Sequence, residues 1–69
     1  MNKFKVGDKV RFIGDHSGIE LTRDKIYEVV SVENVEEGWV RVVTDGGYIN
    51  GWKPMCFERA TSPYLELFL

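Results

Sequence analysis

The stretch that decides the fold is Gly38 to Trp52, which reads GWVRVVTDGGYINGW. Two arms rich in β-branched and aromatic residues, which favour strands, flank the pair Asp45-Gly46. Because a type I′ turn needs positive φ at both of its central residues, Asp-Gly is one of its preferred sequences. The stretch therefore predicts a β-hairpin in which Asp45 and Gly46 form the loop and Trp39 lies opposite Trp52.

The expected hairpin has two different faces, because side chains alternate along a strand. Val42 faces Ile49 in this register, and with Val40 they form an apolar face that we assign to the core. The other face is expected at the surface and carries Trp39, Arg41, Val43, Tyr48, Asn50 and Trp52. A three-residue loop, Asp45-Gly46-Gly47, would instead shift the pairing by one residue.

The composition indicates one small globular domain. The chain has 69 residues, of which 43% are hydrophobic and 29% are charged, so it differs from a disordered segment. A chain of this length buries only about 60% of its unfolded surface, so each apolar strand position matters. No run reaches the roughly 20 apolar residues of a membrane span, and the N-terminus lacks the apolar run of a secretory signal. We therefore expect a cytoplasmic protein without a membrane partner.

The residues that carry chemistry are few. Cys56 is the only cysteine and His16 the only histidine, so we expect no internal disulfide, no metal and no cofactor. His16 and Ser17 are neighbours in a loop, where a base and a nucleophile rarely reach the required geometry. Cys56 stands between Met55 and Phe57, which indicates a small core residue. The sequence therefore predicts a protein that is not an enzyme.

Two strands are expected before the hairpin. Residues 9–13 alternate charged and apolar side chains, and residues 26–32 are rich in β-branched residues. Turn-forming residues at 15–20 indicate a surface loop between them. A bulge near Val29-Val30 would turn more of the second strand's apolar side chains inward. The inward side chains expected from this part of the chain are Val10, Phe12, Leu21, Tyr27, Val29 and Val32.

After the hairpin, residues 53–60 are expected to form one helical turn and a short last strand, because Pro54 lacks a backbone donor. The chain then divides into a domain of residues 1–60 and an apolar C-terminal tail of residues 61–69. That tail either covers the domain or forms an exposed apolar patch. In the second case it would support self-association into a homo-oligomer.

The order strand, long loop, three-strand meander, helical turn and short strand resembles that of a small five-stranded SH3-like barrel. Residues 21–29 resemble the stretch that leaves the long first loop of Src-homology-3 domains and enters their second strand. Trp39 lies where those domains place a ligand-stacking Trp. Gly51 to Phe57 is similar to their Gly-x-x-Pro-x-x-Tyr closing motif, with Phe57 in place of the Tyr. The resemblance covers residues 4 to 60 and implies an all-β fold.

Two narrower resemblances concern the origin and the partner of the chain. Gly7 to Arg11, Lys25 to Val29 and Phe57-Glu58 are similar to segments shared by small SH3-like proteins of bacteriophages and prophages. Val6 to Gly14 also resembles the opening of a KOW motif, a barrel segment used by ribosomal and transcription-elongation proteins. The first implies a phage or prophage gene, and the second implies contact with nucleic acid.

Protein binding is the function that the aromatic residues favour. If Trp39 is exposed beside Pro54, an apolar shelf flanked by acidic loops can take an extended or proline-containing segment. The acidic residues would attract a basic residue of that segment. The hypothesis is a non-catalytic binding module, a phage or prophage factor that engages a host protein. Its candidate binding residues are Trp39, Arg41, Tyr48, Pro54, Phe57, Glu36, Glu37, Asp15 and Glu20.

Nucleic-acid binding is the alternative hypothesis, since small barrels often bind single strands with basic residues and aromatic stacking. The first eleven residues hold four cationic side chains against one acid, Asp8. The whole chain, however, has a net charge of −2, which argues against a strong electrostatic grip on phosphates. The candidate residues for this alternative are Lys3, Lys5, Lys9 and Arg11.

Overall fold

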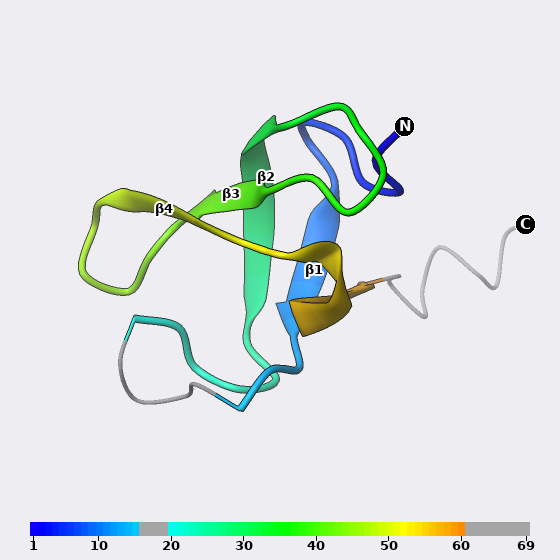
Figure 1. Ribbon diagram of the computed structural model, residues 1–69. Helices are drawn as coiled ribbons and strands as arrows, with labels where there is room; N and C mark the ends of the chain where they lie inside the picture. Colours follow the sequence, from blue (N-terminus) through cyan, green and yellow to red (C-terminus); the bar gives the residue numbers. More distant parts are fainter. Residues whose placement is uncertain (16–19, 61–69) are drawn as a thin grey trace, which may run out of the picture.

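The computed structural model describes residues 1–15 and 20–60. His16, Ser17 and the tail of residues 61–69 lie outside the described residues, so the predictions made for them stay predictions. The described residues form an all-β structure with one 3₁₀ turn and no α-helix (Figure 1). Its elements are β1 (Lys9–Phe12), β2 (Ile26–Val32), β3 (Val40–Val43), β4 (Ile49–Trp52), η1 (Pro54–Cys56) and β5 (Phe57–Arg59).

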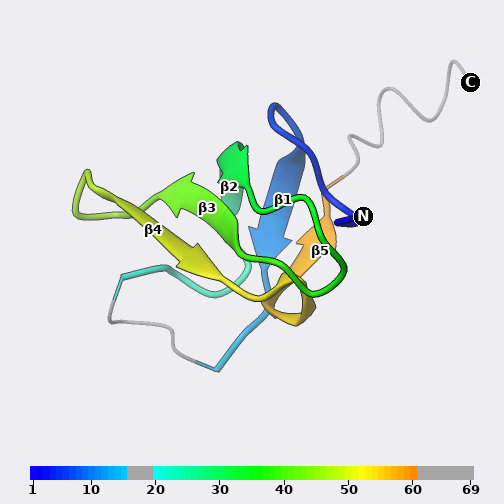
Figure 2. The same ribbon diagram turned by 45° about the horizontal axis from the view of Figure 1, so that its top comes forward.

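The five strands form one antiparallel sheet in the order β4-β3-β2-β1-β5. This confirms the predicted all-β fold, with a short helical turn before the last strand. Figure 2 shows that the sheet bends, so that the chain after β4 returns through η1 to β5 at the side of β1. The ladder is not closed, because β4 and β5 are its two edges. The result is a small barrel-like sheet.

An aromatic cluster fills the concave side of the bent sheet. The ring centroid of Phe12 lies 5.9 Å from that of Phe57 and 6.3 Å from that of Trp52, and Phe4 meets Phe57 at 6.5 Å. These edge-on contacts suit aromatic rings, whose edges and faces carry opposite partial charges. The buried apolar core consists of Phe4, Val10, Phe12, Leu21, Tyr27, Val29, Val40, Val42 and Phe57.

The predicted bulge in β2 is confirmed. Val29 pairs with Val42 of β3, but Ser31 pairs with the next β3 residue, Arg41, so one extra β2 residue stands between the two pairs. The extra residue changes which side chains point inward. Tyr27 and Val29 are buried, and Val32 packs against the core from beyond the bulge.

The predicted two-residue loop of the β3–β4 hairpin is wrong. Val42 pairs with Asn50, which leaves a loop of Asp45, Gly46 and Gly47. The Thr44 N–H donates to the Tyr48 carbonyl at 2.7 Å, and the Gly47 N–H donates to the Thr44 carbonyl at 2.9 Å. Gly47 has φ +87°, so the left-handed residue stands at the third loop position, as is usual in three-residue hairpin loops.

This shift of one residue turns every side chain of β4 to the opposite face. Ile49, predicted in the core, is 59% exposed, which corrects that assignment. Trp52, whose facing the sequence left open between the two-residue and three-residue loops, lies opposite buried Val40 and packs on Phe12. Val40 is fully buried as predicted, because β3 keeps its facing while only β4 slips.

Replacing Gly47 with Ala tests this loop. A side chain at φ +87° is strained, so we expect Gly47→Ala to lower the free energy of unfolding by about 1 to 2 kcal/mol. Gly47→Asn should lose less, because Asn adopts this conformation more readily. The free energy of unfolding of each variant is measured by urea denaturation followed by circular dichroism.

The comparison variant is Gly46→Ala. Gly46 has no positive φ. A Cβ there would come too close only to ring atoms of exposed Tyr48, which can move aside, and would make an ordinary contact with Thr44 Oγ1 at 3.7 Å. A larger loss from Gly46→Ala than from Gly47→Ala would contradict the three-residue loop.

Candidate functional site

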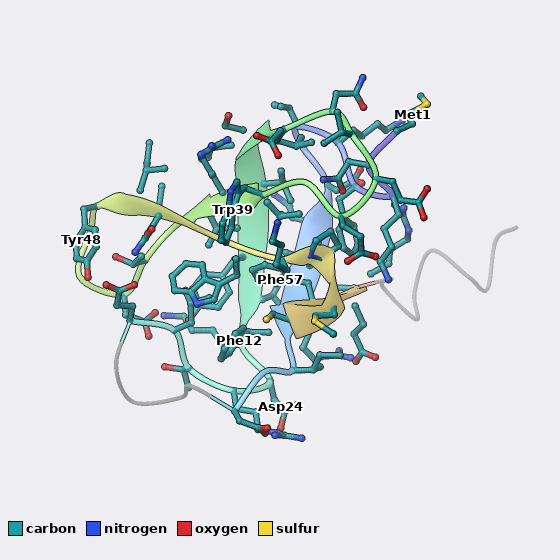
Figure 3. All side chains as sticks on the ribbon, in the orientation of Figure 1. Met1, Phe12, Asp24, Trp39, Tyr48 and Phe57 are labelled. Carbon is teal, nitrogen blue, oxygen red and sulfur yellow. The ribbon has the colours of Figure 1, made fainter. Side chains whose placement is uncertain are left out.

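Trp39 comes directly before β3, next to a glycine that has no room for a side chain. A Cβ on the preceding residue, Gly38, would lie 2.3 Å from the Glu33 carbonyl oxygen, so only glycine fits there. The Glu33 N–H donates to the Trp39 carbonyl at 2.9 Å. With its backbone fixed in this way, Trp39 presents a side chain that is 40% exposed (Figure 3).

The N-terminal arm ties down the same loop. The Asn2 side-chain amide donates to the Glu33 carbonyl at 3.1 Å and to the Gly38 carbonyl at 2.9 Å. Its Oδ1 accepts the N–H of Phe4 at 3.1 Å, and Phe4 is itself a core residue. Asn2 is buried and satisfied, so it links the loop before Trp39 to the core.

The side chain of Lys53 packs over the Trp39 ring. Its Nζ lies 4.3 Å from the ring centroid, a cation–π contact, and donates to the Glu37 carbonyl at 3.0 Å. Glu37 adopts φ +63°, which marks a tight turn in the acidic loop. Lys53 therefore connects the acidic loop at Glu37 to the exposed ring of Trp39.

A shallow depression lies beside Trp39, lined by Trp39, Arg41, Asn50 and Gly51. The observed register places Gly51 opposite Arg41. A Cβ on Gly51 would lie 3.1 Å from Arg41 Cγ and 3.6 Å from Trp39 Cβ, so this glycine forms the floor between the two side chains. Trp39 and Arg41 thus come together as predicted. Asn50, which we expected on the surface face of the hairpin, also lines the depression. Gly51 and Lys53 were missing from the predicted site, and the three-residue loop register would have placed Gly51 opposite Arg41.

The acidic loop and Pro54 occupy a neighbouring place. Glu36 and Glu37 are exposed and line a second shallow pocket with Pro54. Pro54 itself is buried, so it supplies little of the exposed apolar shelf that was expected beside Trp39. Phe57 is only 1% exposed, which excludes it from this surface because it faces inward from β5 against Phe12.

Three predicted site residues lie elsewhere. Figure 3 shows Tyr48 at the loop end of the hairpin, away from Trp39. The Tyr48 hydroxyl donates to Glu20 Oε1 at 2.6 Å, which raises the pKa of Tyr48, and Asn50 Nδ2 donates to Glu20 Oε2 at 2.8 Å. Asp15 pairs with Arg23 at 3.3 Å. Glu20 therefore accepts hydrogen bonds from Tyr48 and Asn50, and these bonds connect the loop before Leu21 to the β3–β4 hairpin.

The basic residues of the alternative hypothesis are distributed among acids. Lys9 pairs with Glu28 across β1 and β2, and Arg11 Nη1 lies 2.8 Å from Glu58 Oε1 across β1 and β5. Lys3 and Lys5, on the N-terminal arm, are exposed beside a cavity of about 560 Å³, whose walls include the arm and Arg59. Opposite charges alternate on the outer face of β1, so it presents no continuous basic stripe.

Sequence reasoning missed a polar cluster around Asp45, which we had assigned only to the turn. Lys25 Nζ at 2.8 Å and the Tyr27 hydroxyl at 2.9 Å donate to Asp45 Oδ1, and the Thr22 hydroxyl donates to Oδ2 at 2.7 Å. These bonds, that of Lys25 first, lower the pKa of Asp45 from 3.8 to about 2. The same contact raises the pKa of Lys25.

Three further features of the described residues bear on function, namely metal ligands, the reactivity of the thiol and membrane-spanning helices. In residues 1–15 and 20–60, no group of three or more His, Cys, Asp or Glu side chains could hold a metal ion. Cys56 is partly buried against the core as predicted, and burial raises the pKa of its thiol, which disfavours the reactive thiolate. No helix in the described part of the chain is long and apolar enough to cross a membrane.

No family model, curated protein or solved structure matches this chain.

The Asp45 cluster predicts a pH dependence of stability. Because the folded pKa of Asp45 lies below its ordinary value, its contribution is complete above pH 3.8 and is lost as pH falls toward 2. We expect Asp45→Asn to be less stable than the wild type at neutral pH, and the gap between their urea midpoints to close over this range.

Asp15→Asn is the control, because Asp15 is an exposed carboxylate in a single ion pair. Its urea midpoint should differ little from that of the wild type. A gap between Asp45→Asn and the wild type that stays constant down to pH 2 would contradict the role given to Asp45.

Proposed function

We propose that this chain is a small SH3-like, non-catalytic protein-binding module. In this proposal it is a phage or prophage factor that engages a host protein in the bacterial cytoplasm. Its binding region is the Trp39 surface, which we define as Trp39, Arg41, Asn50, Gly51 and Lys53. The observation that carries the proposal is the exposed Trp39 ring, held rigidly beside an open depression.

An exposed Trp fixed in this way suits a binding role. Trp is enriched among the residues that dominate the energy of protein interfaces. Lys53 stacks on the Trp39 ring, and Gly38 and Asn2 fix the loop behind it, so little side-chain entropy remains to be lost on binding. Trp52 also follows a glycine but packs on Phe12, which supports a separate role for Trp39.

The SH3-like assignment is supported by the order of the elements. Three consecutive strands form a meander, and the 3₁₀ turn η1 then leads into β5, which pairs with β1. The phage or prophage origin rests on the sequence resemblance of residues 7–11, 25–29 and 57–58. Glu36 and Glu37 line the neighbouring pocket, and Lys53 of the Trp39 surface donates to the Glu37 carbonyl, so we include both acidic residues in the proposed contact region.

The test is capture of a partner from a lysate of the bacterium that carries the gene. Immobilised wild-type protein and Trp39→Ala are compared, and Met55→Ala is the control, because Met55 is 74% exposed and lies outside the Trp39 surface. We expect the wild type and the control to retain the same partner. Trp39→Ala should weaken its binding by at least about tenfold, as loss of a central interface aromatic does.

Circular dichroism first establishes that each variant is folded. Equal capture of the partner by folded Trp39→Ala would overturn the proposed function.

A further inference from the structure

The immediate surroundings of Trp39 are cationic, although the neighbouring loop is acidic. Lys53 Nζ lies over the ring, and Arg41 lines the depression beside it. From the sequence alone we expected acidic side chains to attract a basic residue of the partner. The contacts of Trp39 favour the opposite charge on the group that enters the depression.

These two cations also differ from most of the others. Within residues 1–15 and 20–60, neither Arg41 nor Lys53 forms an ion pair. The cations that do pair with a carboxylate are Lys9, Arg11, Arg23, Lys25 and Arg59. Lys53 donates only to a backbone carbonyl, so its charge is not neutralised by that contact. Among residues 1–15 and 20–60, Arg41 therefore lines the depression without an acidic partner, and Lys53 lies without one over the Trp39 ring that lines the same depression.

The guanidinium of Arg41, which lines the depression, suits a small planar anion. The aliphatic stem of Arg41 lies over Gly51, where a Cβ would approach Arg41 Cγ to 3.1 Å, and both residues line the depression. A guanidinium binds a carboxylate through two parallel hydrogen bonds, which gives geometric specificity as well as charge. The Trp39 ring beside it offers an apolar contact for a neighbouring residue of the ligand.

Two acidic residues near the depression, Glu20 and Glu37, limit how much negative charge a ligand can carry. Glu20 accepts a hydrogen bond from Asn50, which lines the depression, and the backbone of Glu37 accepts one from Lys53. A nucleic-acid strand would bring a row of phosphates toward these carboxylates. One isolated carboxylate avoids that repulsion, so a peptide fits the charge pattern better than a nucleic acid.

We propose that the Trp39 surface recognises a single Asp or Glu in an extended segment of its protein partner. Arg41 donates the paired hydrogen bonds to that carboxylate, and Lys53 adds a second positive charge. An apolar residue next to the acid rests on the Trp39 ring. This inference rests on the proposed function, because it names the partner chemistry of the same surface.

The experiment selects ligands from a displayed library of random heptapeptides on immobilised wild-type protein. We expect the retained peptides to share one Asp or Glu next to an apolar residue. The strongest peptide and its Gln-substituted version are then synthesised with a fluorescent label and measured by anisotropy. The carboxylate peptide should bind at least about tenfold more tightly than the Gln peptide, as charge-assisted bonds require.

Arg41→Gln should remove most of this preference, whereas Arg23→Gln, which changes the net charge equally but lies outside the surface, should keep it. Enrichment of Lys or Arg in the peptides, no retained peptide, or an unchanged preference in Arg41→Gln would overturn the inference. Stronger binding of a labelled thymidine oligonucleotide than of any peptide would do the same.

The Trp39→Ala variant distinguishes failure of the proposed function from failure of the carboxylate inference. Full binding of the selected peptide by Trp39→Ala would overturn the proposed function itself. Loss of binding in Trp39→Ala without a carboxylate preference in the wild type would overturn only the carboxylate inference.

Discussion

The left-handed conformation of Gly47 is the constraint on which the rest of the structure depends. It closes a three-residue loop and thereby sets which β4 residue lies opposite each β3 residue. In this register Trp52 points into the aromatic core, while Gly51 lies opposite Arg41 and leaves a depression beside Trp39. One loop residue therefore determines both the last part of the core and the shape of the candidate binding surface.

The hairpin is anchored at both ends, which explains why its surface can be rigid. At the loop end, Asp45 accepts hydrogen bonds from Lys25, Tyr27 and Thr22, and these join the hairpin to the start of β2. At the other end, Asn2 ties the loop before Trp39 to the N-terminal arm. The Trp39 surface lies between these two sets of hydrogen bonds, which restrain the hairpin at both of its ends.

The sequence predicted the elements whose signals are local. The alternation in residues 9–13, the bulge after Val29 and the turn at Pro54 were all found as expected, because each depends on a few adjacent residues. The β4 facing was wrong because Asp-Gly and Asp-Gly-Gly are both good local turns, and only long-range packing of Trp52 distinguishes them. The roles of Asp45 and Lys53 depend on contacts with distant segments, for which the sequence carries no local signal.

The central claim is the hairpin register, and proton NMR tests it most directly. The Thr44 N–H bonds to the Tyr48 carbonyl, so the next pair along the ladder, Val43 and Ile49, is a non-hydrogen-bonded pair with closely spaced α-protons. A nuclear Overhauser effect between the α-protons of Val43 and Ile49 is the predicted result. An effect between the α-protons of Val43 and Tyr48, which are the non-hydrogen-bonded pair next to a two-residue loop, would contradict the register, and with it the placement of Trp52 in the core and of Gly51 beneath Arg41.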